Sequence, residues 1–342
     1  MVHIAVDIMG GDFCPNSNLE GAYDALQADK DIFLLLTGPE ETIREAVGAW
    51  SRELQDRVSI IPASEVITTE EAPVAAVRKK KDSSLAVGAR LVREGKASAL
   101  ISAGSTGAIL AAGQLIVGRL PGVQRPPLAA MLPTQKGPKL FLDLGANVDA
   151  KPEWLCQFAR MGTIYMERVQ HIASPSVKLV NLGVEEEKGN ALIKAANPML
   201  REMEGINYQG FIESRDVIMG EADIIVADAF TGNAILKTIE GTVEFVMNAM
   251  KDVFKTSFLT ALGALAIKKP LKEKVRGFKA SEHGGAMLLG LNGLVMKCHG
   301  NAGREDIKNA ILKSAQFVRE DVCGRIRDAV TEADTGADGS DV

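Results

Sequence analysis

The chain has 342 residues, enough for one large α/β unit or for two lobes. Its formal net charge of −5 excludes the general basic character of nucleic-acid-binding proteins, so we expect no nucleic-acid partner. The four cysteines are widely spaced without a CxxC pair, and the histidines form no HExxH motif. This pattern fits a reducing compartment and argues against a disulfide framework or a zinc site, and we predict no bound metal.

Short apolar runs recur along the chain, and several are followed by Gly or Asp and then by a helical pattern. We predict strands at 4–6, 33–37, 58–61, 99–101, 128–132, 139–142, 177–182 and 223–226. Strands that alternate with helices indicate a mainly parallel sheet covered on both faces, a three-layer α/β/α fold. Ligands of such sheets bind at the carboxyl ends of the strands.

No low-complexity linker divides the chain, so we predict a single domain over 1–330. Proline-containing loops at 121–127 and 133–138 bracket a short strand that we expect to begin a second lobe. Residues 331–342 are rich in Ala, Asp and Gly, and they predict a disordered tail. The uncharged stretch 97–118 is long enough to span a bilayer. Its small polar centre favours a buried strand, turn and helix instead.

That centre contains Ser105, Thr106 and Gly107, directly after the strand 99–101. A turn of small and hydroxyl-bearing residues exposes backbone N–H groups where the dipole of the following helix is positive. This geometry suits an anion, above all phosphate.

A related loop follows the strand 223–226 and leads into another apolar helix. It holds Asp228, Thr231, Gly232 and Asn233, with Lys237 one helical turn further on. We expect the Thr231 hydroxyl, the backbone amides and the Asn233 amide to face an anion.

Two further loops combine carboxylates with glycines or amides. Asp7, Gly10 and Gly11 end the first strand, where paired glycines let the backbone approach a ligand closely; the alternative is a tight turn with a cap. Asp143 and Asn147 follow the strand 139–142, where Asn147 could donate to an oxyanion. The alternative there is an Asx-turn with a helix cap.

The remaining polar candidates lie in the second half of the chain. Lys188 and Asn190 follow the strand 177–182 and could clamp phosphate, although a solvated helix start is the alternative. His283 precedes two glycines and could act as a base or donor, or be merely structural. The segment Lys297-Cys298-His299 lies downstream of it.

An apolar helical face with flanking lysines is predicted near residue 260. A basic amphipathic helix of this kind suits an anionic membrane surface or an acidic partner; core packing or a dimer interface is the alternative. The face consists of Phe254, Phe258, Leu262 and Leu265.

Taken together, the motifs resemble PlsX, the bacterial phosphate acyltransferase family of phospholipid synthesis, over about residues 2–325. The sequence has no GxGxxG, P-loop or GxSxG motif. The resemblance rests on DIMGGD (7–12), SAGSTG (102–107), DLGANVD (143–149), EEEKGN (185–190), FTGN (230–233) and HGGA (283–286).

The resemblance implies an acyltransferase that converts acyl carrier protein bearing an acyl thioester, plus inorganic phosphate, to acyl phosphate, with no cofactor. It also implies a fold similar to phosphotransacetylases and isocitrate/isopropylmalate dehydrogenases, and a cytoplasmic homodimer associated with the inner face of the plasma membrane. On this basis we expect Ser105, Thr106, Lys188 and Thr231 to hold phosphate. Asn147 and Asn233 would polarise the thioester carbonyl, and His283 would orient phosphate or relay a proton.

Two other classes of function remain open from the sequence. One is an NAD-dependent dehydrogenase of similar fold, since isopropylmalate dehydrogenases also lack the dinucleotide fingerprint. The other is a non-catalytic, membrane-docked scaffold that binds acyl carrier protein.

Overall fold

The computed structural model describes residues 1–257, 260, 263–264, 267 and 284–337, with side chains as far as residue 331. Its strands join in one sheet of order β3-β2-β1-β4-β11-β10-β5-β6-β9-β7-β8. The strands are β1 (Val2–Asp7), β2 (Ile32–Gly38), β3 (Val58–Pro62), β4 (Ala99–Ser102), β5 (Leu128–Leu132), β6 (Lys139–Leu142), β7 (Ser176–Asn181), β8 (Asn207–Glu213), β9 (Ile224–Val226), β10 (Ala286–Leu288) and β11 (Leu294–Lys297).

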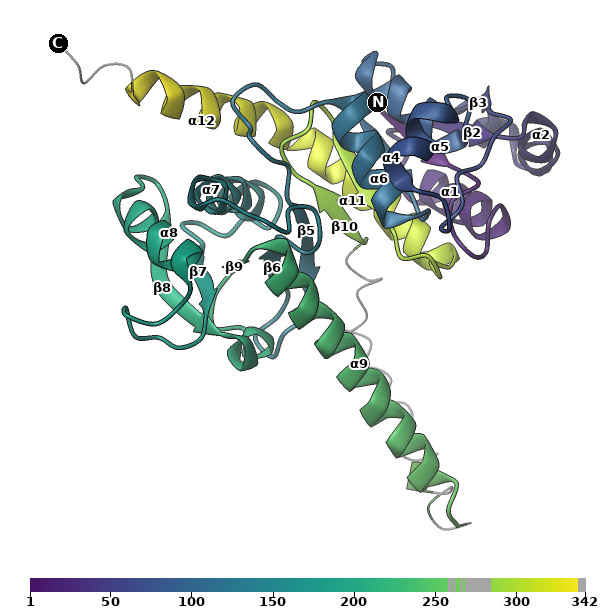
Figure 1. Ribbon diagram of the computed structural model, residues 1–342. Coiled ribbons are helices and arrows are strands. Elements are labelled where there is room, and N and C mark those ends of the chain that lie inside the picture. The colour runs from purple at the N-terminus through teal and green to yellow at the C-terminus, as the bar shows by residue number, and fades with distance from the viewer. Residues whose placement is uncertain (258–259, 261–262, 265–266, 268–283, 338–342) are drawn as a thin grey trace.

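Helices cover both faces of this sheet (Figure 1). They are α1 (Asn16–Ala28), α2 (Glu40–Gly48), α3 (Arg52–Gln55), α4 (Pro73–Lys79), α5 (Ser84–Arg93), α6 (Thr106–Ala112) with the π-helical turn η1 (Gly113–Val117), α7 (Pro152–Arg168), α8 (Ala191–Glu202), the 3₁₀ helix η2 (Ser214–Met219), α9 (Ala229–Phe254), α11 (Arg304–Arg319) and α12 (Val322–Ala337).

The two faces follow from alternation along the strands. In β1, Ile4 and Val6 pack in the hydrophobic cluster that includes α1 and α11, whereas Ala5 packs with α5 on the other face. Strands in the interior of the sheet, such as β2 and β4, are buried on both sides, as expected for parallel strands between helical layers. The predicted three-layer α/β fold is therefore confirmed.

All of the predicted strands are present, but three others were not predicted. β8 has few buried apolar residues, and β10 and β11 are short segments separated by a glycine-containing turn. β5 and β10 run antiparallel to their neighbours, and all the remaining pairings are parallel. These two strands lie between the N-terminal half of the sheet and its second half. The chain therefore enters the second half at β5, which is where we predicted that the second lobe begins. The division into two lobes stays a prediction.

The carboxyl-terminal end of the chain differs from the predicted disordered tail. Helix α12 contacts α7 and continues to Ala337, so the tail predicted from residue 331 is helical to that point. Ile326 and Val330 are buried and anchor the part of this helix that precedes residue 331. In the part of the chain that the structure describes, no helix is long and apolar enough to cross a membrane.

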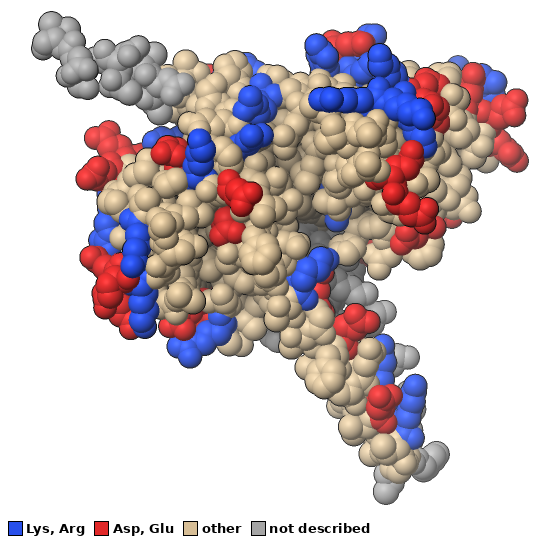
Figure 2. Space-filling model, viewed as in Figure 1, with Lys and Arg blue, Asp and Glu red and all other residues tan. Residues whose placement is uncertain are grey.

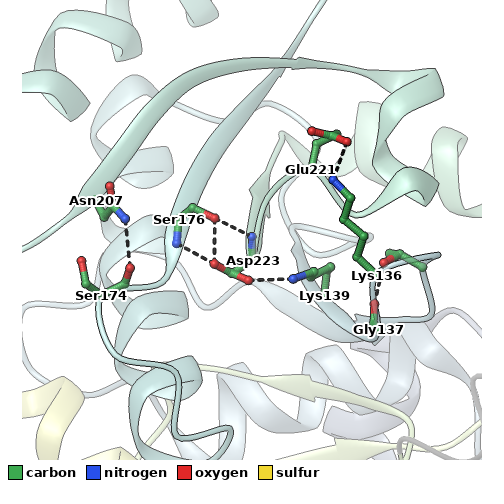
Figure 3. Close-up of polar contacts among 9 residues, drawn as sticks. Lys136, Gly137, Lys139, Ser174, Ser176, Asn207, Glu221 and Asp223 are labelled. Carbon is green, nitrogen blue, oxygen red and sulfur yellow. Dashed lines mark hydrogen bonds and ion pairs between the residues drawn. The ribbon is translucent and has the colours of Figure 1, made fainter.

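A polar cluster joins the amino-terminal ends of β6, β7 and β9 (Figure 3). The Asp223 carboxylate accepts hydrogen bonds from Lys139 Nζ at 2.7 Å and from the Ser176 hydroxyl at 2.7 Å and backbone N–H at 2.9 Å. Burial raises the pKa of Asp223, but the hydrogen bonds from Lys139 and Ser176 outweigh it, so the pKa is lowered overall. The cluster therefore fixes the register of three strands through one carboxylate.

We expect Asp223→Asn to lower the free energy of unfolding by about 1 kcal/mol at pH 7, because charge-assisted hydrogen bonds are lost at a site partly screened by water. The folded-state pKa lies below that of the unfolded chain. The stabilisation is thus present above about pH 3.9 and is lost as the pH falls through the folded value. Urea unfolding at pH 7 and pH 3 measures both effects.

The exposed pair of Glu221 with Lys136, 2.8 Å apart in the same close-up, supplies the control. We expect Glu221→Gln to leave stability unchanged at both pH values, because exposed ion pairs contribute little. An equal loss in the two variants would contradict a specific role for Asp223.

Candidate active site

A cavity of about 140 Å³ lies between α9, the central strand β5 and the loop that follows β4. We call it the α9 pocket. Its lining comes from segments far apart in the sequence, as expected for a site assembled at strand ends. The lining residues are Thr106, Leu128, Ala130, Met131, Leu132, Pro133, Leu144, Asn233, Leu236, Lys237, Glu240, Gly285, Ala286, Lys297 and His299.

One side of α9 forms a wall of this pocket. Asn233, Leu236, Lys237 and Glu240 follow the spacing of three and four residues that places side chains on one helical face. The opposite wall is apolar and comes largely from β5 and Leu144. The pocket thus has a polar side and an apolar side.

The polar side carries more positive than negative groups. Lys237 Nζ lies 2.7 Å from one oxygen of Glu240, and His299 Nε2 lies 3.6 Å from the other. His299 lowers the pKa of Glu240 to about 2, with help from Lys237 and against the effect of burial. Glu240 is therefore a carboxylate at neutral pH, and Lys297 stands beside it as a second lysine.

In the loop predicted to bind an anion, the Asp228 side chain caps the start of α9. The Asp228 carboxylate accepts the Thr231 backbone N–H at 2.9 Å and the Thr231 hydroxyl at 2.7 Å. Both donors of Thr231 are thus engaged, and a carboxylate stands where the anion was expected. This geometry does not support a phosphate contact by Thr231 or by Asp228.

Gly232 serves close packing. A Cβ at this position would lie 2.0 Å from the carbonyl oxygen of Asp143, so only glycine lets the first turn of α9 rest on the loop after β6.

That loop is organised by the buried Asp143 carboxylate. It accepts backbone N–H groups from Leu128 at 2.9 Å, Gly145 at 3.1 Å, Ala146 at 3.0 Å and Asn147 at 2.8 Å. Burial raises the pKa of Asp143, and these hydrogen bonds oppose that rise.

The Asn147 side chain belongs to the same arrangement. Its amide nitrogen donates to Asp143 at 2.7 Å and to the Pro126 carbonyl at 3.0 Å. Its backbone carbonyl accepts the N–H of Ala229, the first residue of α9. Because both amide hydrogens are engaged, Asn147 positions the loop and α9, and a direct bond to a thioester carbonyl would require one of them to break.

The loop after β1 also packs tightly behind the pocket. Asp7 is buried and accepts the Ser102 hydroxyl at 2.7 Å, and burial raises its pKa despite its hydrogen bonds. A Cβ on Gly10 would lie 2.8 Å from both the Asp7 carboxylate and the Gly104 nitrogen, and Gly11 has a φ of +97°. These residues hold the ends of β1 and β4 together and do not line the pocket.

The small-residue turn after β4 reaches the pocket through one residue. Thr106 is exposed and lies in the lining, while Ser105 is the N-cap residue of α6 and makes no capping hydrogen bond through its side chain. Gly107 packs against Pro73, where a Cβ would lie 2.5 Å from the ring. Of this motif, the structure brings Thr106 together with Asn233.

The loop after β7 contributes no residue to the lining of the α9 pocket. Lys188 is exposed and pairs with Glu185 at 2.8 Å, which raises its pKa. Asn190 caps α8 by accepting the Ile193 N–H at 3.0 Å. Among the described residues, no hydrogen bond or ion pair joins Lys188 to the pocket lining.

Several other predicted residues cannot be placed. His283, Phe258, Leu262 and Leu265 lie outside the described residues. Phe254 is the last residue of α9 and is half-buried.

Lys237 was noted from the sequence one turn after Asn233, and Lys297 and His299 downstream of His283, but none of the three was assigned a role; Glu240 was not noted. The spacing of four residues places Lys237 on the same helical face as Asn233. Lys297 ends the short apolar strand β11, a place where ligands bind in such sheets.

Comparisons with known proteins agree with this architecture. A phosphotransacetylase of Streptococcus pyogenes superposes with a TM-score of 0.57 at 18% identity, covering 93% of this chain and 94% of that one. A branched-chain phosphotransacylase of Enterococcus faecalis gives a TM-score of 0.55 at 12% identity, covering 93% and 99%. At these identities the likeness concerns the fold.

Similarity in sequence is much closer. A phosphate acyltransferase of Clostridium perfringens is 44% identical over 331 residues, 97% of each chain, and one of Halothermothrix orenii is 43% identical over 97% of this chain and 99% of its own. The family profile described as "Fatty acid synthesis protein" matches residues 2–325. The predicted family and the acyltransferase class are confirmed: the chain belongs to the fatty acid synthesis protein family and is an acyltransferase enzyme of the phosphate acyltransferase kind.

Proposed function

We propose that this enzyme transfers a fatty acyl group from the thioester of an acyl carrier protein to inorganic phosphate. The observation that carries the proposal is the two-sided α9 pocket, in which Thr106, Asn233 and two lysines face an apolar wall. The polar side suits a phosphate and the thioester carbonyl, and the apolar side suits the first carbons of an acyl chain. The names of the close relatives support the same reaction.

The chemistry requires no nucleophile from the protein. A phosphate oxygen attacks the thioester carbon, the C–S bond breaks, and the carrier leaves as a thiolate that takes up a proton. The enzyme must hold the two reactants together and stabilise the negative charge that develops on the carbonyl oxygen. Asn233 has an amide donor in the pocket for that oxygen, and Thr106 has a hydroxyl for phosphate.

A basic surface beside the pocket supports an acidic carrier protein as the acyl donor. Arg78, Lys79 and Lys81 are exposed at the end of α4, and α4 packs on α6, which begins at Thr106. Complementary charge of this kind steers partners together.

We expect purified protein to form acyl phosphate from acyl carrier protein and labelled phosphate, and Asn233→Ala to lower kcat/KM about a hundredfold through loss of an oxyanion donor. Asn248→Ala is the matched control, since Asn248 lies further along the same helix and outside the pocket. Absence of acyl phosphate with the unmodified protein would contradict the proposed reaction. Equal rates for the two variants would remove Asn233 from the site.

We further propose that two copies associate through the outer half of α9, which extends well beyond the sheet (Figure 1). An apolar face on this half, the α9 stripe, is largely uncovered in the single chain; Phe245 is 73% exposed and Val253 57%. In Figure 2 the charged side chains of this half gather along one edge, and the rest of its visible surface is uncharged. The stripe consists of Phe245, Val246, Ala249, Met250, Val253 and Phe254.

We expect Phe245→Glu to convert the dimer to a monomer, because a charge would be buried without a partner at the interface. Asn248→Glu adds the same charge on the other side of the helix and should leave the dimer intact. Sedimentation equilibrium gives the mass of each variant. A dimer that survives Phe245→Glu would contradict an interface on the stripe.

We propose, finally, a cytoplasmic enzyme that binds the inner face of the plasma membrane through the end of α9. Lys251 and Lys255 flank Phe254 there, and basic residues beside an apolar face favour anionic lipid. We expect vesicles with anionic phospholipid to sediment the protein and vesicles of neutral phospholipid not to. The double variant Lys251→Gln/Lys255→Gln should weaken the binding, and equal sedimentation with both kinds of vesicle would contradict an electrostatic contribution.

A further inference from the structure

Lys297 is the last residue of β11 and lies at the centre of the sheet. It is opposite Ser102 of β4 on one side and Ala286 of β10 on the other. Its neighbours in sequence, Met296 and Cys298, are buried, and its own side chain is half-buried in the lining of the α9 pocket. The backbone around Lys297 is thus held rigidly, and only its side chain faces the cavity.

Among the described residues of the pocket, Lys297 has no carboxylate of its own to balance its charge. Glu240 is the carboxylate of the lining, and its two oxygens face Lys237 and His299. Among the described residues, no hydrogen bond or ion pair engages the Lys297 ammonium. Burial lowers the pKa of Lys297, and the charge of Lys237 lowers it further.

An enclosed cation without a partner is costly, and an anion in the pocket would relieve that cost. A lysine binds phosphate as a compact point charge with three donors. Thr106 adds a hydroxyl to the lining of the same cavity, and its apolar residues offer room for an acyl group.

We propose that the Lys297 ammonium binds the attacking inorganic phosphate in the α9 pocket, with Lys237 as the second cation. This inference rests on the proposed function, since phosphate is the reactant there. A phosphodiester on the carrier's prosthetic group offers similar oxyanion chemistry. Binding of inorganic phosphate in the absence of the carrier would identify inorganic phosphate, and not the phosphodiester, as the ligand.

Titration calorimetry with inorganic phosphate, in the absence of any acyl donor, tests the binding directly. We expect Lys297→Met to weaken phosphate binding at least about tenfold, the loss of a charge-assisted hydrogen bond, and Lys297→Arg to restore part of it. Lys136→Met removes an exposed lysine that pairs with Glu221 and should bind phosphate as the unmodified protein does.

Thermal unfolding distinguishes this role from a structural one. Phosphate should raise the Tm of the unmodified protein and of Lys136→Met but not of Lys297→Met, while Lys297→Met without phosphate should be at least as stable as the unmodified protein. In the acyl phosphate assay, Lys297→Met should raise the KM for phosphate and leave the KM for the acyl donor near its original value.

Unchanged phosphate affinity in Lys297→Met would overturn the proposal. A rise in the KM for the acyl donor alone would also overturn it, and would point to the carrier's phosphodiester. If the unmodified protein binds phosphate through Lys297 but forms no acyl phosphate, the proposed function fails and the phosphate site stands.

Discussion

A single buried carboxylate, that of Asp143, holds together the part of the molecule on which the active site depends. It gathers the backbone N–H groups of the turn after β6, and it fixes the Asn147 amide. Asn147 in turn receives the first N–H of α9, and Gly232 lets that helix rest on the turn. Since burial opposes the charge of Asp143, these hydrogen bonds are what make its ionised form tolerable there.

Helix α9 carries two surfaces with different chemistry. Its first turns present Asn233, Lys237 and Glu240 to the pocket, whereas its outer turns carry the stripe that includes Phe245 and Val253. With 3.6 residues per turn, these two sets lie on different sides of the helix. The pocket wall and the proposed assembly surface can therefore be used at the same time.

The sequence predicts the fold well, because each strand can be recognised from a short stretch of residues. Buried strands appear as apolar runs in the sequence. Of the described strands, only β8, β10 and β11 were not predicted, because they are short or weakly apolar. The site is predicted less well. The motifs direct attention to the loops at the strand ends, and Thr106 and Asn233 both line the α9 pocket.

The same residue types also serve as caps, and the sequence cannot tell the two uses apart. Asp228 and Asn190 carry the polar groups expected of a ligand site, yet they cap the starts of α9 and α8. Lys297 shows the converse, because its proposed role depends on the lack of a hydrogen-bond or ion-pair partner among the described residues, which only three-dimensional packing reveals.

The length of α9 gives its attachment a mechanical consequence. A helix of 26 residues is about 39 Å long, so a tilt of about 5° at the end held by Asn147 displaces the other end by about 3 Å. The same tilt moves Lys237 and Glu240, about two and three turns from the pivot, by only a fraction of that distance. A small tilt of α9 would therefore move the far end of the helix much more than the wall of the α9 pocket.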